Sequence, residues 1–538
     1  MLQSTASTEI LALNRVTFGA RDSDAAFVRK VGWGAWVDEQ LSPPTGDDPA
    51  LAAHMAQQTM RISYNGQPAT TGIVGWPTIN QLRPLNYMSA DISTLWDLAR
   101  NVEYSVAANE LSRVQQEICA ATWIRNTHSA FQLREFMVDF WNNHFNIGRQ
   151  ADIFASVALP IYDTQVIRPR ALGNFRDLLE AVATSTSMLR YLNNAESSAA
   201  LPNENYAREI LELHTLGAPS YLGLPPAQSA GIFPLQRGLF AKGFTDQDII
   251  EASRALSGWT VEQGQASPKG TLPSTGRFTY NALQHSTQAR AFLGVDISAL
   301  KGDMEQGRAV LDIIANHPAT AEFVCIKIAR RMFGDAPPMA VIARAKQAWL
   351  ASRTSGDQIK RVLAAMLQDG DEIKMPLSQC SKLRRPYERI IAFFRTTDTT
   401  VSAFDLASSA ATALGDGVYV WPTPEGRPDT DKQWLSTSAN LYNWNLPLLL
   451  LAQTAFRTSL RAQTPSSASA SPTLLVEYWV ERMVGYALRP AGMAALIEDA
   501  ATPGGAMAAY ASGGALNIEN ALRRLVALIA TSPEFGVR

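Results

Sequence analysis

Hydrophobic residues recur with the spacing of amphipathic helices over most of the chain. After Ser23, a good N-cap, the segment DAAFVRKV has this spacing and stops at Gly32, and a second short helix follows it. These segments predict a helical hairpin within residues 1–45. Longer stretches with helical spacing cover residues 91–145, 171–192, 203–216 and 304–367.

Turn and β signals interrupt the helical pattern. Residues 61–90 are rich in turn formers and predict a long loop. Within residues 261–294, glycine, proline and serine surround the β-favouring run RFTY, which predicts a small hairpin or flap. Thr245 and Asp248 have the spacing of a capping box that opens another helix. The expected fold class is mainly α: a large multi-helix body with a small β hairpin or flap and long Pro/Gly-rich loops.

Composition along the last third of the chain predicts a domain boundary. Residues 416–436 are rich in proline and carry two tryptophans, which is too rigid and aromatic for an ordinary linker, so we expect them to pack against the body. Residues 464–473, TPSSASASPT, have the composition of a flexible linker. We therefore expect a main helical domain over residues 1–460 and a loosely attached C-terminal helical subdomain over residues 474–538.

Charge and composition exclude several classes of protein. Hydrophobic residues make up 46% of the 538 residues, which excludes a disordered chain. The net charge of -2 argues against a nucleic-acid binder with a basic surface. The most apolar run, Leu446 to Ala452, is too short to span a membrane. The amino terminus has no signal-peptide pattern, so we expect a cytoplasmic protein or the mature form of an exported one.

The densest polar cluster is NENYAREILELHTLG, which predicts a helix over residues 203–216 with Asn203 as its cap and Gly217 as its stop. Glu204, Arg208 and Glu212 share one face of this helix, and Glu209 lies roughly 100° round from Arg208. The same geometry separates Glu212 from His214. A metal or acid–base site would therefore need groups from a second element.

The second element is DFWNNHFN, residues 139–146, in the last turn of a helix expected over residues 131–146. It carries Trp141, Asn142, Asn143 and His144. Structural roles compete with functional ones at both clusters. Arg208 can form an ion-pair ladder with Glu204 and Glu212, His214 can be a favourable cation at a helix end, and Trp141 can be a core residue.

No HExxH, P-loop, GxGxxG after a strand or GxSxG motif occurs. Five segments in order nevertheless resemble the bacterial family called domain of unknown function eighteen hundred. They are LNRVTFGARDSDAAFVRKVGWGAWVDEQLSP, DFWNNHFNI, NENYAREILELHTLG, GFTDQDIIEASRALSGWTV and HPATAEFVCIKIARRMFGDAPP. The resemblance implies a large, mostly helical protein, often exported and often encoded beside a sulfatase-like companion that is a possible partner.

The family's polar motifs fall on a defined set of positions here: Trp141, Asn142, His144, Asn203, Glu204, Asn205, Arg208, Glu209, Glu212, His214, Arg254, Gly258 and Trp259. One departure is His285, which precedes Ser286 where the family tends to have aspartate. This position therefore has no carboxylate in this chain.

Three functions remain open. The first is a hydrolase acting on a glycan or another envelope or extracellular substrate, with catalytic residues on the glutamate-rich helix. Its catalytic candidates are Glu204, Glu209, Glu212 and Arg208, and its substrate-binding candidates are Trp141, Asn142, His144, Asn205 and Trp259.

The second is a metal-dependent hydrolase or oxidoreductase, in which His144 and His214, with Glu209 or Glu212, hold one Zn or Fe ion. A protein without any metal is equally expected. The third is a non-catalytic scaffold or binding protein whose polar clusters form a buried network. A pocket open to solvent favours the first two functions, and full burial with every partner satisfied favours the third.

Overall fold

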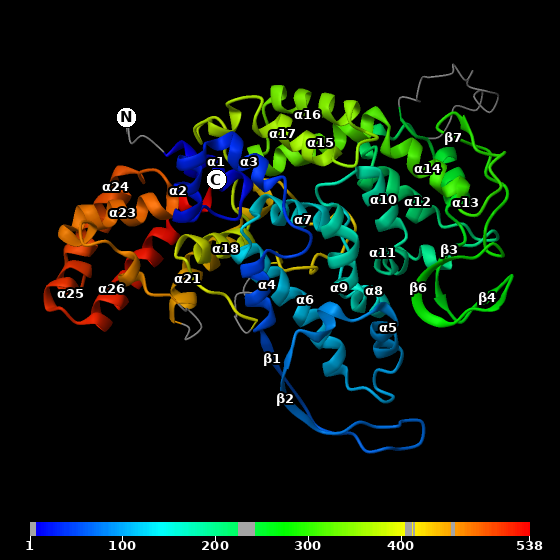
Figure 1. Ribbon diagram of the computed structural model, residues 1–538, viewed down its shortest axis with the longest axis horizontal. Helices are drawn as coiled ribbons and strands as arrows, with labels where there is room; N and C mark the ends of the chain where they lie inside the picture. Colours follow the sequence, from blue (N-terminus) through cyan, green and yellow to red (C-terminus); the bar gives the residue numbers. More distant parts are fainter. Residues whose placement is uncertain (1–6, 224–242, 404–411, 413–414, 453–457) are drawn as a thin grey trace.

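The computed structural model describes residues 7–223, 243–403, 412, 415–452 and 458–538. The fold is mainly α, as the periodicity predicts, with small two-stranded antiparallel sheets. The helices form an elongated body, with the C-terminal helices at one end, the small sheets at the other and one β ribbon projecting from the middle (Figure 1). The expected class of a multi-helix body with minor β structure is confirmed.

The N-terminal helices are α1 (Thr8–Val16), α2 (Asp22–Val31) and α3 (Trp33–Gln40). Gly32 joins α2 to α3 with a φ of 85°, a conformation that favours glycine, and so makes the hairpin turn where the sequence predicts it. The cap of α2 is Arg21 and not Ser23, because the Asp24 side chain accepts a hydrogen bond from the Arg21 backbone N–H.

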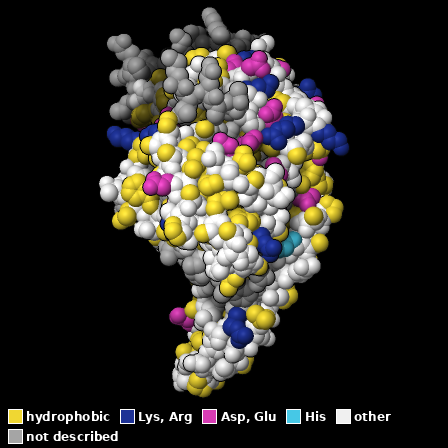
Figure 2. All heavy atoms as spheres, turned by 90° about the vertical axis from the view of Figure 1, so that its left-hand side faces the viewer, with side chains coloured by type: hydrophobic (Ala, Val, Ile, Leu, Met, Phe, Trp, Pro, Cys, Tyr) yellow, Lys and Arg dark blue, Asp and Glu magenta, His cyan; other side chains and the backbone are white. Residues whose placement is uncertain are grey.

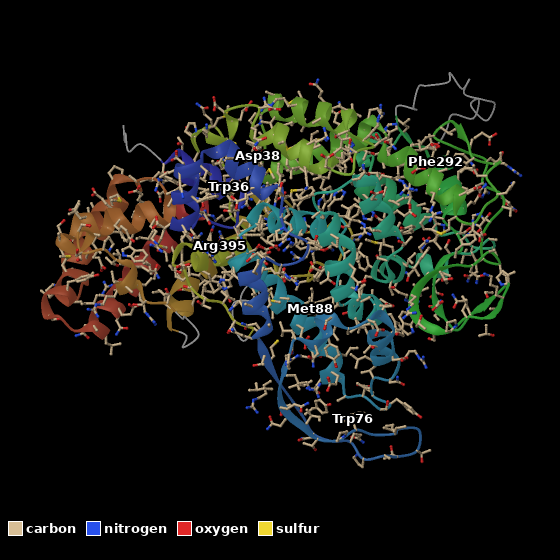
Figure 3. All side chains as sticks on the ribbon, in the orientation of Figure 1. Trp36, Asp38, Trp76, Met88, Phe292 and Arg395 are labelled. Carbon is tan, nitrogen blue, oxygen red and sulfur yellow. The ribbon has the colours of Figure 1, made fainter. Side chains whose placement is uncertain are left out.

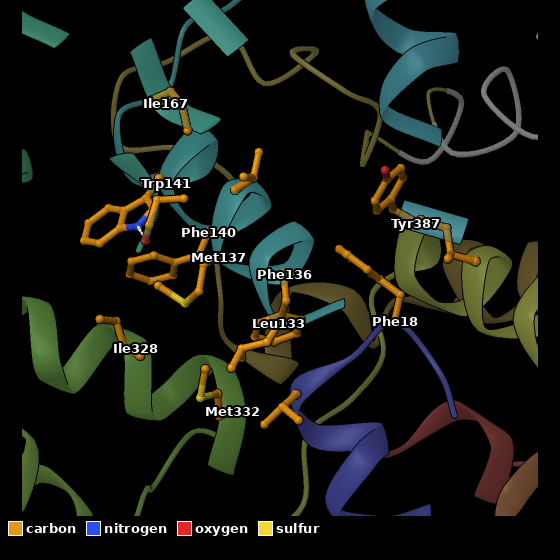
Figure 4. Packing of buried hydrophobic residues seen from close by; sticks show 14 of the residues in the cluster. Phe18, Leu133, Phe136, Met137, Phe140, Trp141, Ile167, Ile328, Met332 and Tyr387 are labelled. Atoms are coloured by element: carbon orange, nitrogen blue, oxygen red, sulfur yellow. Dashed lines mark hydrogen bonds between the residues drawn. The ribbon is translucent and has the colours of Figure 1, made fainter. Parts of the chain in front are cut away.

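The centre of the body is α7 (Gln132–His144), which is buried along most of its length. Phe136, Met137 and Phe140 lie at its surface toward α15 (Pro318–Phe333), while Phe18 and Tyr387 pack beside its N-terminal half (Figure 4). One continuous cluster of buried apolar residues runs from the N-terminal to the C-terminal helices. The body therefore has a single large core.

The other helices of the body surround this core. Those before the flap are α4 (Pro49–Ala56), α5 (Ile92–Arg100), α6 (Ala108–His128), α8 (Ile153–Val157), α9 (Leu159–Ile161), α10 (Phe175–Ala183), α11 (Thr186–Tyr191), α12 (Glu204–Glu209) and α13 (Asp246–Ala255). Those after it are α14 (Glu305–Ala315), α16 (Met339–Ala351), α17 (Gln358–Leu367) and α18 (Pro386–Thr396). Among the described residues no single helix is long and apolar enough to cross a membrane; α14 and α15 together meet that test but bend by 61° between them.

Residues 61–90 do not form the expected loop. Strand β1 (Thr59–Tyr64) pairs with β2 (Ile79–Pro84) in an antiparallel ribbon, and a short 3-10 helix follows it. The ribbon is a narrow projection below the body (Figure 2), and Trp76 lies in the loop at its far end (Figure 3). The abundance of turn formers reflects that end loop. The flanking strands are short, and the alternation of Met60, Ile62 and Tyr64 in β1 covers only six residues.

The expected flap is present as three small hairpins. Strand β3 (Trp259–Gln263) pairs with β6 (Ser274–Tyr280), and two further pairs of two-residue strands extend it: β4 (Ala266–Ser267) with β5 (Gly270–Thr271), and β7 (Ala291–Phe292) with β8 (Val295–Asp296). The run RFTY lies in β6, as the sequence predicts. The capping box of Thr245 and Asp248 opens α13.

The C-terminal region holds α20 (Asp431–Trp434), α21 (Thr437–Ala452), α22 (Leu460–Gln463), α23 (Pro472–Val484), α24 (Pro490–Ala501), α25 (Ala506–Ser512) and α26 (Ala515–Thr531). These helices share the core of the body, and the final residue returns to its centre. Arg538 pairs with Lys382 through both backbone groups, and its side chain bonds to the carbonyl oxygens of Arg15 and Arg331. Buried hydrogen bonds therefore join this residue to the body.

Candidate functional site

The glutamate-rich helix begins as its sequence predicts. The Asn203 side chain accepts a hydrogen bond from the Tyr206 N–H at 2.9 Å, which caps α12. After Glu209 the helix continues as a π turn over Ile210–His214, a form that is frequent at functional sites. It ends at Gly217, where a φ of 88° and the close Phe323 ring exclude a side chain.

Arg208 is a positioning residue on this helix. Its guanidinium lies 3.1 Å from a carboxylate oxygen of Glu212 and 3.1 Å from one of Asp246, and it also stacks over the Tyr221 ring. Of the two ion pairs predicted for Arg208, the one with Glu212 is present. Its second partner is Asp246 on α13 in place of Glu204. Glu204 is exposed at the helix start, next to the exposed Asn205.

Glu209 differs from the other glutamates of the helix. It is half-buried and makes no hydrogen bond or ion pair to any other described residue. Burial raises the pKa of its carboxyl group, and the negative charges of Glu212 and Glu425 raise it further. A carboxyl group that holds its proton to a higher pH suits a general acid.

Tyr191, at the end of α11, lies near the same carboxyl group. Its hydroxyl donates a hydrogen bond to the Pro422 carbonyl oxygen at 2.7 Å. Burial raises the pKa of this hydroxyl to about 12, and the charges of Glu425 and Glu209 add to the shift. Two neighbouring helices, α11 and α12, therefore meet the Trp/Pro-rich segment 416–436, which is distant in sequence.

The DFWNNHFN cluster holds the Trp/Pro-rich segment in place. The Asn143 side chain bonds to both backbone groups of Arg427, at 2.7 and 3.0 Å, and the Asn146 amide donates to the Trp421 and Thr423 carbonyl oxygens. The expectation that this segment packs against the body thus has a specific basis. These asparagines are occupied in structural bonds and are not available to a ligand.

Asp139 anchors the same contact through charge. Its carboxylate is buried and accepts hydrogen bonds from Arg331, Arg385 and Arg427. Although burial opposes ionisation, the three guanidinium groups lower the pKa of Asp139 to about 2. The second polar cluster is thus largely a buried network, as the scaffold hypothesis requires.

The aromatic candidates for substrate binding lie inside the protein. Trp141 is fully buried and donates a hydrogen bond to the Ala171 carbonyl oxygen at 2.9 Å. Trp259 is fully buried on β3 and packs against Gly307. Neither ring has surface to offer a sugar, so we do not carry either into the site.

Asn142 faces a cavity that is too small for a substrate. Its side chain donates to Asp163 and accepts from the Tyr419 hydroxyl. The cavity of about 20 Å³ beside it, also lined by Asp139 and Asn146, has room for about one water molecule. Asn142 is therefore part of the interior network.

His144 and His214 lie close together, and Lys327 lies beside them. His144 Nε2 lies 3.0 Å from the His214 carbonyl oxygen, and His144 Nδ1 lies 2.9 Å from Lys327 Nζ. Burial and the lysine charge lower the pKa of His214 to about 3, and they hold that of His144 well below its usual range. Burial also lowers the pKa of Lys327 to about 8. Both imidazoles are thus neutral.

This arrangement does not fit a metal ion. Both ring nitrogens of His144 already have partners, and one partner is an amine that carries a positive charge when protonated. Within the described parts of the chain, no three His, Cys, Asp or Glu side chains gather where they could hold a metal. His144 and His214 are therefore a buried contact between α7 and the π turn.

Sequence reasoning missed four groups that complete these clusters, namely Tyr191, Asp246, Lys327 and Glu425. Each lies on a different element from the residue it contacts, and none stands in a local pattern that marks it. Asp246 has the nearest signal, since it follows the Thr245 cap. Glu425 lies in the segment that composition had already set apart.

The geometry can be compared with known proteins. No curated protein and no solved structure matches this chain. A family model described as "Protein of unknown function (DUF1800)" matches residues 11–537, nearly the whole chain, in agreement with the resemblance of the five segments. The chain therefore belongs to the DUF1800 family of proteins of unknown function.

Proposed function

We propose that this protein is a hydrolase that works by general acid–base catalysis on α12 and the π turn after it. The observation that carries the proposal is Glu209, a half-buried carboxyl group with a raised pKa and no hydrogen bond to the part of the chain that the structure describes. Two neighbouring carboxyl groups with different environments are the usual arrangement of an acid and a base. Glu212, ion-paired with Arg208, is the second of the pair.

In this proposal each residue has one role. Glu209 donates its proton to the leaving-group oxygen as the scissile bond breaks. Glu212 accepts a proton from the water molecule whose oxygen forms the new bond. Arg208, fixed by Asp246, holds the Glu212 carboxylate in position. A glycan remains the proposed substrate, since glycoside hydrolysis commonly uses such a pair of carboxyl groups.

The other two hypotheses divide along the two clusters. A metal-dependent mechanism lacks support, because the donor groups of His144 and His214 do not suit an ion. The scaffold hypothesis accounts for Asp139, Asn143 and Asn146, whose bonds are satisfied inside the protein. It does not account for Glu209.

The test is a hydrolysis screen with paired variants. Purified protein is incubated with polysaccharides and nitrophenyl glycosides, and released reducing ends or nitrophenol are measured from pH 4 to pH 9. We expect Glu209→Gln to lower the turnover about 100-fold or more, in the range that general acid catalysis contributes. The matched control is Glu322→Gln on α15, whose exposed carboxylate pairs with Lys346 on α16.

Full turnover in Glu209→Gln, with the fold intact by circular dichroism, would remove Glu209 from the mechanism. Loss of turnover equally in Glu322→Gln would show that the effect is not specific to the site.

A further inference from the structure

We propose that a pocket between α5, α9, α11 and β6 binds a single sugar that carries a carboxylate or phosphate group. These four elements lie together in Figure 1, and the pocket has a volume of about 300 Å³, at the lower end of the range for small-molecule sites. Among the described residues that line it are two arginines and two half-buried threonines, but no aspartate or glutamate. The proposal is separate from the assignment of Glu209, which does not line this pocket.

One wall of the pocket comes from a π-helical segment, Tyr162–Ile167, and the 3-10 turn Arg168–Arg170 that follows it. Segments of π-helix are frequent at functional sites. The half-buried Arg170 side chain donates from Nη1 to the Gln165 and Val166 carbonyl oxygens, at 2.6 and 3.2 Å, which fixes the guanidinium group beside this wall. Its Nη2 and Nε groups have no hydrogen bond to the part of the chain that the structure describes, so they are available to a ligand.

The second arginine of the pocket is Arg277 on β6, which is far from Arg170 in sequence. It is exposed, and its guanidinium group has no hydrogen bond or ion pair to any residue that the structure describes. Guanidinium groups bind carboxylate and phosphate oxygens through charge-assisted hydrogen bonds. Two arginines from separate elements that lack a carboxylate partner therefore favour an anionic ligand.

Three carboxylates lie next to lining residues in the chain, and each has other partners. Asp163 is fully buried and pairs with Arg125 and Arg168. Glu180 on α10 forms ion pairs with two further arginines. Asp91 caps α5 and accepts hydrogen bonds from the first turn of that helix. These carboxylates therefore do not neutralise the two arginines of the pocket, and an anion bound there would meet their positive charge.

Thr184 and Thr186, at the junction of α10 and α11, supply hydrogen-bond acceptors to the same pocket. Their hydroxyl groups donate to the carbonyl oxygens of Glu180 at 2.8 Å and Gly276 at 2.6 Å. Because each hydroxyl proton is already used, the oxygen offers its remaining lone pair to a donor. The hydroxyl groups of a sugar are such donors, so the pocket suits a molecule with both an anionic group and hydroxyl groups.

The test is calorimetric titration of the whole chain with glucuronate, with a phosphate monoester of glucose and with neutral glucose. We expect at least one of the two charged sugars to bind the wild-type protein, and glucose to bind at least about tenfold more weakly, because it lacks the charge. Arg277→Gln should weaken binding of the charged sugar at least about tenfold. Its fold should be intact by circular dichroism, since the exposed guanidinium group has no bond to the described residues. The matched control, Arg29→Gln, removes an exposed arginine of α2 that does not line the pocket, and it should bind as the wild-type protein does.

Absence of binding by both charged sugars overturns the inference, and so does equal affinity of the wild-type protein and Arg277→Gln for them. Glucose that binds as tightly as the charged sugars would contradict the role of the arginines. Titration with inorganic phosphate and acetate completes the comparison. If either binds as tightly as the charged sugar, the pocket takes an adventitious ion only, and the assignment of a sugar is wrong.

Discussion

Carboxyl groups of one chemical type have opposite environments in this protein. Glu209 meets two negative charges and has a raised pKa, whereas Asp139 meets three guanidinium groups and has a pKa of about 2. Burial and Glu212, three residues away, raise the pKa of Glu209, and Glu425 adds to this from a distant segment. The three arginines that lower the pKa of Asp139 all lie far from it in sequence. At the scale of single residues, the tertiary environment therefore decides which carboxyl group is reactive and which is structural.

Glu209→Gln should be slightly more stable than the wild-type protein at neutral pH. The pKa of Glu209 is higher in the folded protein than in the unfolded chain. Its contribution to stability is therefore fully present at a pH below the unfolded-state pKa and is lost as the pH rises through the folded-state pKa. The glutamine amide of the variant does not ionise. The variant should therefore be more stable than the wild-type protein above this pH range and equally stable at low pH. With allowance for solvent screening it should be about 0.5 kcal/mol at most.

Urea unfolding of both proteins at pH 4 and pH 8 measures this difference. A variant that is less stable than the wild-type protein at pH 8 would contradict the assigned environment of Glu209, whatever its activity.

Asp139→Asn should lower the free energy of unfolding by about 3 kcal/mol at pH 7, because it leaves buried guanidinium groups without their shared carboxylate. Because folding lowers the pKa of Asp139, its carboxylate stabilises the fold fully at a pH above its pKa in the unfolded chain, about 4. This stabilisation is lost as the pH falls toward the folded-state pKa of about 2. The deficit of the variant should therefore shrink between pH 7 and pH 3 in urea titrations. Asp357→Asn, at a largely exposed position, is the control and should cost less than 0.5 kcal/mol.

At the scale of elements, the sequence predicted the features that depend on neighbouring residues and missed those that depend on long-range contacts. The caps at Asn203 and Thr245 and the break at Gly32 are local, because the groups that satisfy them lie within a few residues. The β1–β2 ribbon was missed because its two short strands pair across a long loop whose turn formers dominate the local pattern. The π turn after Glu209 was also missed, since a regular helix and a π turn share one hydrophobic pattern.

The Trp/Pro-rich segment depends on glycine where it meets α7. At Gly426, which has a φ of 75°, an added Cβ would lie 2.2 Å from the Asn143 carbonyl oxygen. Gly426→Ala should therefore destabilise the protein by at least about 2 kcal/mol, through overlap and backbone strain together. The control is Gly513→Ala. Gly513 has a φ of 73° and open space around it, so this variant measures the cost of backbone strain without overlap.

Thermal unfolding of the two alanine variants, with limited proteolysis of residues 416–428, makes the comparison. Equal losses of stability in Gly426→Ala and Gly513→Ala would mean that the contact with Asn143 contributes nothing.

At the scale of the whole molecule, Arg538 connects helices that are far apart in the sequence. Arg538 reaches the carbonyl oxygens of Arg15 and Arg331 and the Glu388 carboxylate, so the last residue joins the N-terminal helices to α15 and α18. Such contacts couple distant segments into one cooperative unit. A domain boundary between residues 460 and 474 stays a prediction. Among the described residues, buried apolar side chains of the C-terminal helices belong to the same cluster as those of the body.

Arg538→Ala should lower the stability by about 2 to 4 kcal/mol, because it removes buried hydrogen bonds at the centre of the molecule. We expect one unfolding transition, observed together by circular dichroism and tryptophan fluorescence. Arg524→Ala, which removes a half-exposed partner of Asp499 on α26, should change the stability by less than 1 kcal/mol. Two separate transitions in the wild-type protein would instead support an independent C-terminal subdomain.

The sequence by itself determined the helical class, the helix limits that have local caps, the hairpins of the flap and the family. It also marked both polar clusters, because polar side chains are rare on otherwise apolar helices. Only the tertiary structure decided their separate roles. Asn143 bonds to a residue 284 positions away and Asn146 to one 275 positions away, while Glu209 has no hydrogen-bond partner among the residues that the structure describes. Burial and charge at a residue are set by whatever packs against it, and in this protein those neighbours come from elements that no local pattern connects.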